Sequence, residues 1–290
     1  MSSLGARRPR RLARLNGVRL AAIVLLIVGV IPLAIPLLWM VSTSLKNEFD
    51  VFVNPPVFIP ELPRWSNYAE VFSTTPFAKQ YFNSLYIGAA NVLGTVVVSS
   101  FAGYALARLR FPGRQFVLPF LLGALLLPPE VTIVPLYALM SRLGWVGTHM
   151  PLLIEPVFGA PTVVGTFLMR QFFLSLPREL QDAGRVDGLS EFGVFWRIAL
   201  PLARPAIATL AILTFLSSWN AFLEPLVFIS GNRDLFTLPV ALTQFTDVDG
   251  TVFFALQMAA TALSIVPVVV VFLLAQRYIV EGIARSGIKG

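Results

Sequence analysis

The sequence contains no cysteine and only one histidine, His149, among its 290 residues. Without cysteine the chain has no disulfide, no catalytic thiol and no thiolate ligand for a metal. A single histidine argues against a His-ligated metal site and against a Ser-His catalytic triad. No pair of carboxylates is spaced for hydrolytic chemistry. We therefore expect no catalytic residue and no metal site, which counts against an integral membrane enzyme.

A nucleotide-binding pattern is also missing. The sequence G-x-x-x-x-G-K-[ST], whose backbone N–H groups hold phosphates, does not occur, so the chain is not expected to bind ATP itself. A transport protein of this composition must draw its energy from a partner or from an ion gradient. Ion-coupled transporters usually carry ionisable residues inside their spans, and only Glu130, Glu155 and Glu224 are candidates here.

Charged residues are scarce, at 13% of the chain, whereas 56% of the residues are apolar and the mean hydropathy is +0.77. Such a chain belongs in a bilayer. Runs long enough to cross about 30 Å of hydrocarbon predict an all-α integral membrane protein with six transmembrane helices. We place the spans near 20–42, 84–107, 116–140, 150–170, 204–230 and 252–279. They form one domain, 20–279, between a basic segment, 1–19, and a tail, 280–290.

The basic residues are unevenly distributed between the connections. Residues 1–19 contain six arginines and no acid, and 108–114 and 170–204 are also rich in arginine. The alternate connections are neutral or acidic, with three basic and four acidic residues in 43–83 and one against three in 231–250. Positive residues mark the cytoplasmic side, so both termini are expected inside the cell. Topology and lipid headgroups account for the net charge of +7, and no nucleic-acid partner is needed.

The second span is rich in small and weakly polar residues. Small residues let helices approach closely in lipid, so this helix is expected to lie inside the bundle. The residues concerned are Ser84, Gly88, Asn91, Gly94, Ser99, Ser100 and Gly103.

The longest polar interruption in the second half is 175–202. Pro177 suits the start of a helix, which the residues up to Val186 favour, and Gly188 supplies a left-handed stop. Ser190 can cap a second helix. That helix carries an apolar stripe of Phe192, Phe195, Trp196 and Ala199. The segment therefore predicts a helix, a glycine turn and a second helix.

This stretch resembles the cytoplasmic EAA loop of ABC importer permeases. The family triplet Glu-Ala-Ala reads Asp182-Ala183-Gly184 here, and Asp187-Gly188 and Leu200-Pro201-Leu202 follow. The resemblance implies a coupling helix that docks into a cleft on an ATPase subunit; the alternative is an ordinary amphipathic interhelical loop. The residues it implicates in ATPase coupling are Glu179, Asp182, Ala183, Gly184, Asp187, Gly188, Phe192 and Pro201.

Further motifs, in the same order and at similar distances, resemble the carbohydrate-type permeases of this family. They are Asn83-Ser84-Leu85, Tyr104–Arg108 with Phe111 and Gly113, Leu127-Pro128 with Pro135-Leu136-Tyr137, Trp219-Asn220 with Pro225-Leu226, and the C-terminal run from Gln276 to Gly290. The resemblance implies a type I ABC importer permease fold in the bacterial cytoplasmic (inner) membrane.

The resemblance also implies partners. They would be a second permease subunit, two ATPase subunits that bind ATP and Mg²⁺, and an extracytoplasmic solute-binding protein, all surrounded by membrane lipid. The chain itself would bind no cofactor. The C-terminal tail, through Gly282, Gly287 and Lys289, is a second candidate contact with the ATPases.

Polar residues at lipid depth are candidates for the solute path. We select Glu130, Asn220 and Glu224, with Trp219 and Asn91 as further candidates, because planar polar groups and aromatic faces bind sugars. The alternative for each is interhelical hydrogen bonding or packing. We therefore expect a permease subunit of an ATP-driven importer for a sugar or a sugar-like solute such as glycerol phosphate. The alternative is an ion-coupled secondary transporter that acts without an ATPase.

Overall fold

The computed structural model describes residues 10–229, 231–246 and 250–286. Within these ranges the regular structure is helical, apart from one isolated bridge between Thr246 and Val252. Four helices are long and apolar enough to span a membrane, and the number rises to six if each of two sharply bent helix pairs counts as one span. The predicted helical membrane fold is confirmed, whereas the continuity of two spans is not.

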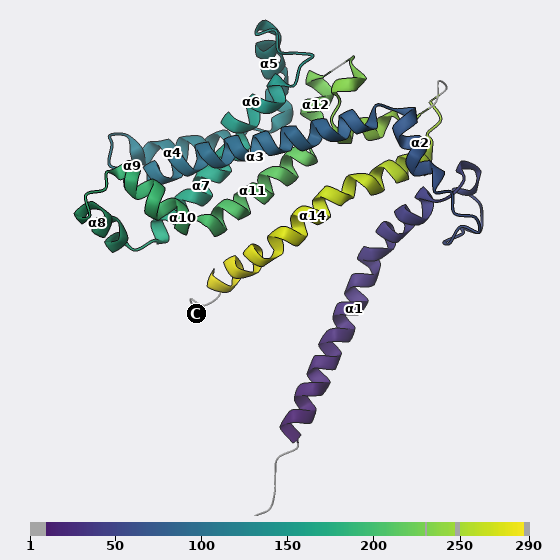
Figure 1. Cartoon of the computed structure of the whole chain (residues 1–290), viewed down its shortest axis with the longest axis horizontal. Helices are drawn as coiled ribbons and strands as arrows, with labels where there is room; N and C mark the ends of the chain where they lie inside the picture. The colour runs from purple at the N-terminus through teal and green to yellow at the C-terminus, as the bar shows by residue number, and fades with distance from the viewer. Residues whose placement is uncertain (1–9, 230, 247–249, 287–290) are drawn as a thin grey trace, which may run out of the picture.

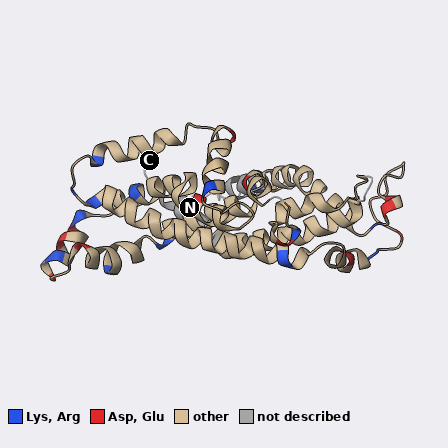
Figure 2. Ribbon diagram, turned by 90° about the horizontal axis from the view of Figure 1, so that it is seen from above, with Lys and Arg blue, Asp and Glu red and all other residues tan. Residues whose placement is uncertain are grey.

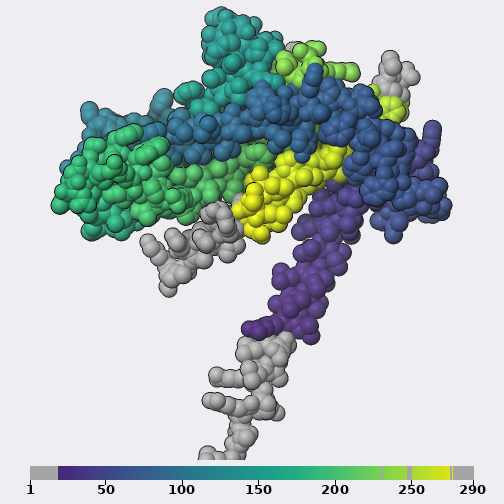
Figure 3. All heavy atoms as spheres, viewed as in Figure 1, coloured from purple at the N-terminus to yellow at the C-terminus, as the bar shows by residue number. Residues whose placement is uncertain are grey.

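The first span, α1 (Arg10–Ser44), lies apart from the other helices and meets them only near its C-terminal end (Figures 1 and 3). The most apolar 18 residues within Arg19–Ser44 have a mean hydropathy of 2.9, and none of them is buried. It packs against α14 (Phe254–Ser286), which also spans. Two short elements follow α1, namely η1 (Glu48–Asp50) and α2 (Ser66–Thr74).

The central helix is α3 (Phe77–Arg108), which packs against α6, α7 and α11 (Figure 1). Its small residues make these contacts close. A Cβ at Gly103 would lie 2.7 Å from Met169 Cβ and 2.9 Å from the Arg170 nitrogen. The prediction that this span lies inside the bundle is confirmed, although the helix begins at Phe77, seven residues before the predicted start.

The third predicted span, 116–140, is not one continuous helix. It is divided into α4 (Arg114–Ala124) and α5 (Pro129–Arg142), which meet at 99°. Pro128 has an extended backbone with ψ 138°, because a residue followed by proline is disfavoured in the helical region. Hydropathy is high on both sides of the break, so an average over the run conceals it.

The fourth span consists of α6 (Met150–Phe158) and α7 (Ala160–Ser175), separated at Gly159. Gly159 has an extended backbone with ψ −154°, and Pro161 occupies the first turn of α7. The two helices together still form a candidate span of 26 residues, Met150–Ser175, which ends five residues later than predicted.

The fifth predicted span, 204–230, is also interrupted. Helix α11 (Arg204–Trp219) ends eleven residues earlier than expected, and α12 (Leu223–Phe228) is a separate short helix. The segment that precedes α11 joins it at 74°. Between α7 and α11 lie α8 (Arg178–Val186), α9 (Glu191–Val194), the π-helical η2 (Phe195–Ala199) and α10 (Leu200–Leu202). Between α12 and α14 lie η3 (Arg233–Leu235), α13 (Leu238–Ala241) and η4 (Leu242–Gln244).

The close crossing of α3 and α7 generates a stability prediction. We expect Gly103→Ala to destabilise the protein by about 1–3 kcal/mol, because its Cβ overlaps backbone atoms of α7. Gly123→Ala in α4 is the matched control, since no atom lies within 4 Å of its Cβ and helix propensity favours alanine equally at both sites. Thermal unfolding of the purified protein in detergent measures the difference. Equal melting temperatures for the two variants would contradict the close packing of α3 against α7 at Gly103.

Candidate functional site

The loop between α8 and α9 has the turn geometry that its sequence predicts. Gly188 has φ +81°, a left-handed conformation that side chains resist. The Leu189 N–H donates to the Gly184 carbonyl at 2.9 Å and the Gly188 N–H to the Arg185 carbonyl at 3.0 Å. These are the two hydrogen bonds of a Schellman motif. At the start of α9, the Ser190 hydroxyl accepts from the Gly193 N–H at 3.2 Å. Both predicted helix boundaries are confirmed.

The predicted apolar stripe of the second helix is divided between two environments. Phe195 and Ala199 are buried, whereas Phe192 is 65% exposed and Trp196 is 55% exposed. The two exposed rings stack on each other, with centroids 6.2 Å apart. The stripe is thus only half-buried, and the π-helical turn at 195–199 departs from the α-helical period.

Gly184 lies inside this chain rather than on its outer surface. A Cβ at this position would lie 2.8 Å from Ile198 Cδ1 and 3.1 Å from Val194 Cγ2. Its small size therefore lets α8 pack against α9 and η2. Ala183, the next residue of the triplet, is exposed.

Glu191 joins three elements, and sequence reasoning missed it. One of its carboxylate oxygens accepts from Arg185 Nε at 2.7 Å, and the other accepts from Gln181 Nε2 at 3.0 Å and from the Tyr104 hydroxyl at 3.4 Å. The hydrogen bond to Glu191 raises the pKa of Arg185 further above its ordinary value. Arg185 also contacts Asp182 at 3.4 Å. The sequence shows only that an acid directly follows the Ser190 cap. The partners of Glu191 on α8 and α3 depend on tertiary packing, which the sequence does not reveal.

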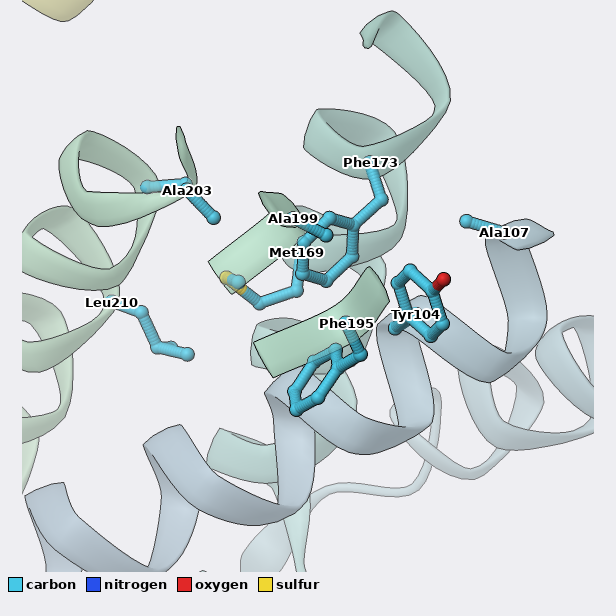
Figure 4. Close-up of a cluster of buried hydrophobic side chains, with 9 residues drawn as sticks. Tyr104, Ala107, Met169, Phe173, Phe195, Ala199, Ala203 and Leu210 are labelled. Atoms are coloured by element: carbon cyan, nitrogen blue, oxygen red, sulfur yellow. The ribbon is translucent and has the colours of Figure 1, made fainter. Parts of the chain in front are cut away.

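A buried cluster connects this segment to three long helices (Figure 4). Rings of Tyr104, Phe173 and Phe195 pack against one another with centroids 5.0–6.4 Å apart. Arg108, at the end of α3, donates to the Phe173 and Leu176 carbonyls at the end of α7. The remaining members come from α3, α7, η2 and α11, and they are Ala107, Met169, Ala199, Ala203, Ala206 and Leu210.

In the described part of the chain, the outward face of α8 has an ion-pair partner at only one residue. Glu179, Asp182, Ala183 and Val186 are all exposed and share one face at helical spacing, with Val186 88% exposed. Among the described residues, only Asp182 of these four has an ion pair, with Arg185. Asp187 and Pro201 are exposed as well. Figure 2 shows charged residues gathered at this end of the molecule.

Of the three predicted tail residues, Gly282 lies within α14, whereas Gly287 and Lys289 lie outside the described residues.

A cavity of about 630 Å³ lies where the broken helices meet. Four of the five residues selected for the solute path line it, each from a different element. They are Asn91 of α3, Glu130 of α5, Asn220 after α11 and Glu224 of α12. Figure 1 shows α5, α6 and α12 on the same side of α3. The structure thus brings together residues up to 133 positions apart in the sequence.

Trp219 does not line this cavity. It is 3% exposed and donates from Nε1 to the Ser264 carbonyl at 3.2 Å. Its ring stacks on Phe215 with centroids 5.5 Å apart. Trp219 therefore packs α11 against α14, which is the alternative considered for it from the sequence.

Glu155 lines the cavity although the sequence placed it near the outer end of its span. A Cβ at Gly159 would lie 2.4 Å from Glu155 Oε1, so the break between α6 and α7 leaves room for this carboxylate. The signal available in the sequence was an acid between two prolines, Pro151 and Pro156, inside an apolar run.

Comparison with known proteins identifies the family. Residues 95–285 match the family described as binding-protein-dependent transport system inner membrane component. The chain belongs to this family of permeases. It is 36% identical over 272 residues to the probable ABC transporter permease protein YurM of Bacillus subtilis, covering 92% of this chain and 87% of that protein. It is 37% identical over 258 residues to the arabinooligosaccharides transport system permease protein AraQ of Halalkalibacterium halodurans, covering 88% and 91%.

The fold of this permease is shared with a solved importer. A chain in the crystal structure of a bacterial ABC transporter involved in the import of the acidic polysaccharide alginate superposes with a TM-score of 0.77. The match covers 96% of this permease and 99% of that chain at 23% identity. The predicted type I importer permease fold is therefore confirmed. Family membership confirms a multi-pass inner-membrane transport subunit that depends on a binding protein, rather than an enzyme.

The Schellman turn at Gly188 generates a second prediction. We expect Gly188→Val to speed hydrogen exchange of the amides that close α8, because a β-branched residue at φ +81° costs about 1–2 kcal/mol. Gly188→Asn is the matched control, since asparagine tolerates this conformation better. Exchange mass spectrometry of the peptide covering 178–190 measures both variants. Equal protection in Gly188→Val and the unmodified permease would show that the turn does not need glycine.

Proposed function

We propose that this permease is one membrane subunit of an ATP-driven importer of a sugar. It pairs with a second permease, two ATPase subunits and an extracytoplasmic solute-binding protein, and both of its termini lie in the cytoplasm. Segment 175–202 transmits the closure of the ATPases, and the cavity lined by Asn91, Glu130, Asn220 and Glu224 forms its part of the solute path.

The observation that carries the coupling proposal is the exposed face of α8 on a rigidly held helix. Its inner face is packed through Gly184, its end is closed by Gly188, and Glu191 ties it to α3. The outer face, from Glu179 to Val186, is left available. A short helix held in this way moves with the bundle rather than independently of it.

Motion of α8 has a physical route to the cavity. The cluster that contains Tyr104, Phe173 and Phe195 joins the segment to α3, α7 and α11. Side chains of α3 and residues at the far ends of α7 and α11 line the cavity. A rotation imposed on α8 by ATPase closure therefore reorients the cavity walls, as required for alternating access.

The orientation follows from the basic residues. Five arginines belong to α8, to η2 or to the ends of α3 and α7 that adjoin this segment, namely Arg108, Arg170, Arg178, Arg185 and Arg197. Figure 2 shows basic residues at this end of the molecule. An excess of arginine next to spans is typical of the cytoplasmic side. The coupling segment then faces the compartment that contains ATP, which is the orientation that the proposal needs.

The solute class is supported by the relative named for arabinooligosaccharides. A cavity of about 630 Å³ on this subunit alone is within the range of pockets that hold small molecules. Amide and carboxylate side chains offer the planar hydrogen-bonding groups that hydroxyl-rich solutes require.

The exposed face of α8 generates a third prediction. We expect Ala183→Asp to reduce copurification of the ATPase subunits and solute-stimulated ATP hydrolysis at least about tenfold, because it buries an unpaired carboxylate at the proposed contact. The variant should retain its yield and melting temperature, since Ala183 is exposed in this subunit. Pull-down in mild detergent, followed by an ATPase assay, measures both.

Gln115→Asp, an exposed position in α4, is the matched control for an added carboxylate. It should leave both readouts unchanged. Full ATPase association of Ala183→Asp would overturn the coupling proposal. Uptake driven by an ion gradient in vesicles that contain this chain without an ATPase would favour the secondary transporter instead.

A further inference from the structure

The cavity wall contributed by this permease carries charge of one sign. Glu130, Glu155 and Glu224 line it, and no lysine, arginine or histidine occurs among the described residues that do so. None of these three carboxylates has an ion-pair or hydrogen-bond partner in the described part of the chain. The charge is therefore not neutralised within this subunit.

The two amide side chains of the cavity are partly engaged within the protein. Asn91 Nδ2 donates to Ser218 Oγ at 3.0 Å, and Asn220 Nδ2 donates to the Leu216 carbonyl at 2.8 Å. Each amide thus uses one of its two N–H groups within the protein. Asn91 is only 2% exposed, and its Oδ1 has no partner among the described residues, which is costly for a buried acceptor.

Thr237, a further lining residue, is 4% exposed and its hydroxyl also has no partner among the described residues. A ligand with hydroxyl groups can donate to the carboxylates that line the cavity. A metal ion is a poorer fit, because the described residues contain no group of three or more acidic, histidine or cysteine side chains that could hold one.

We propose that this wall passes uncharged, hydroxyl-rich solutes and excludes anionic ones. The inference rests on the proposed function, since it assigns a solute class to the proposed path. An anionic sugar would meet three carboxylates and no cation, and like charges in a cleft repel strongly where water is sparse. The shared fold therefore does not extend to a shared solute class with the alginate importer.

The absence of cysteine allows a direct test of the wall charge. Ser217→Cys places one thiol on the cavity wall, at an exposed residue whose hydroxyl has no hydrogen-bond partner among the described residues. It is the only thiol of this subunit. The assembled importer in nanodiscs is treated with neutral, anionic and cationic methanethiosulfonates. Mass spectrometry of this subunit measures the rate at which each reagent modifies the thiol. Each rate is then divided by the rate of the same reagent with a free thiol in solution.

We expect the anionic reagent to react at least about tenfold more slowly than the neutral one, because a cleft of one sign changes local ion concentration by about 10–10³. Replacing the three acids together (Glu130→Gln, Glu155→Gln and Glu224→Gln) should bring the ratio close to one. Ser73→Cys, exposed in α2 and remote from the cavity lining, is the control position, where the three glutamine replacements should leave the ratio unchanged.

A neutral-to-anionic ratio near one with Ser217→Cys alone would overturn the proposal, even if the glutamine variant does not fold. A high ratio that persists after the glutamine replacements would also overturn it, since another charge would be responsible. The proposed function is tested separately in the same sample. If adding ATP and vanadate leaves all reaction rates of the cavity thiol unchanged, the cavity is not part of an alternating path, whatever its charge.

Discussion

Lipid offers no hydrogen-bond partner to a polypeptide backbone, and the arrangement of this permease depends on that constraint. Each break in a membrane helix frees carbonyl and N–H groups that must be placed beside protein or water. The breaks at 125–128, Gly159 and 220–222 all occur next to residues that line the central cavity. The cavity lies at the ends of the interrupted helices, so the freed backbone groups can be placed beside protein or water rather than lipid.

Two distant regions are connected by continuous packing. The coupling segment meets the bundle at the cluster around Tyr104 and Phe173, and α3 extends from that cluster to the cavity without interruption. Glycines at the crossings of α3 with α7 bring backbones into contact, where packed interfaces deform little. Helix α3 is continuous, whereas its neighbours are broken into shorter helices. The shorter helices can therefore tilt relative to α3, which stays straight.

The sequence predicted the elements whose signals are local. Long apolar runs located α1, α3 and α14, Gly188 located the end of α8, and Ser190 located the start of α9. Hydropathy could not resolve the breaks within 116–140 and 204–230, because apolar residues continue on both sides of them. The choice of polar residues at lipid depth selected four residues that line one cavity, Asn91, Glu130, Asn220 and Glu224. The roles of Glu191, Trp219 and Glu155 depend on neighbours far along the chain, which residue spacing cannot reveal.

The separation of α1 from the bundle makes this subunit responsive to membrane thickness. The 26-residue stretch Arg19–Ser44 is about 39 Å long at 1.5 Å per residue, against about 30 Å of hydrocarbon. With no helices packed along most of its length in this chain, α1 can absorb the hydrophobic mismatch by tilting, at a cost of fractions of a kcal/mol per Å. Its contact with α14 then acts as a pivot, so a thicker or thinner bilayer changes the angle of α1 while the remaining helices keep their packing.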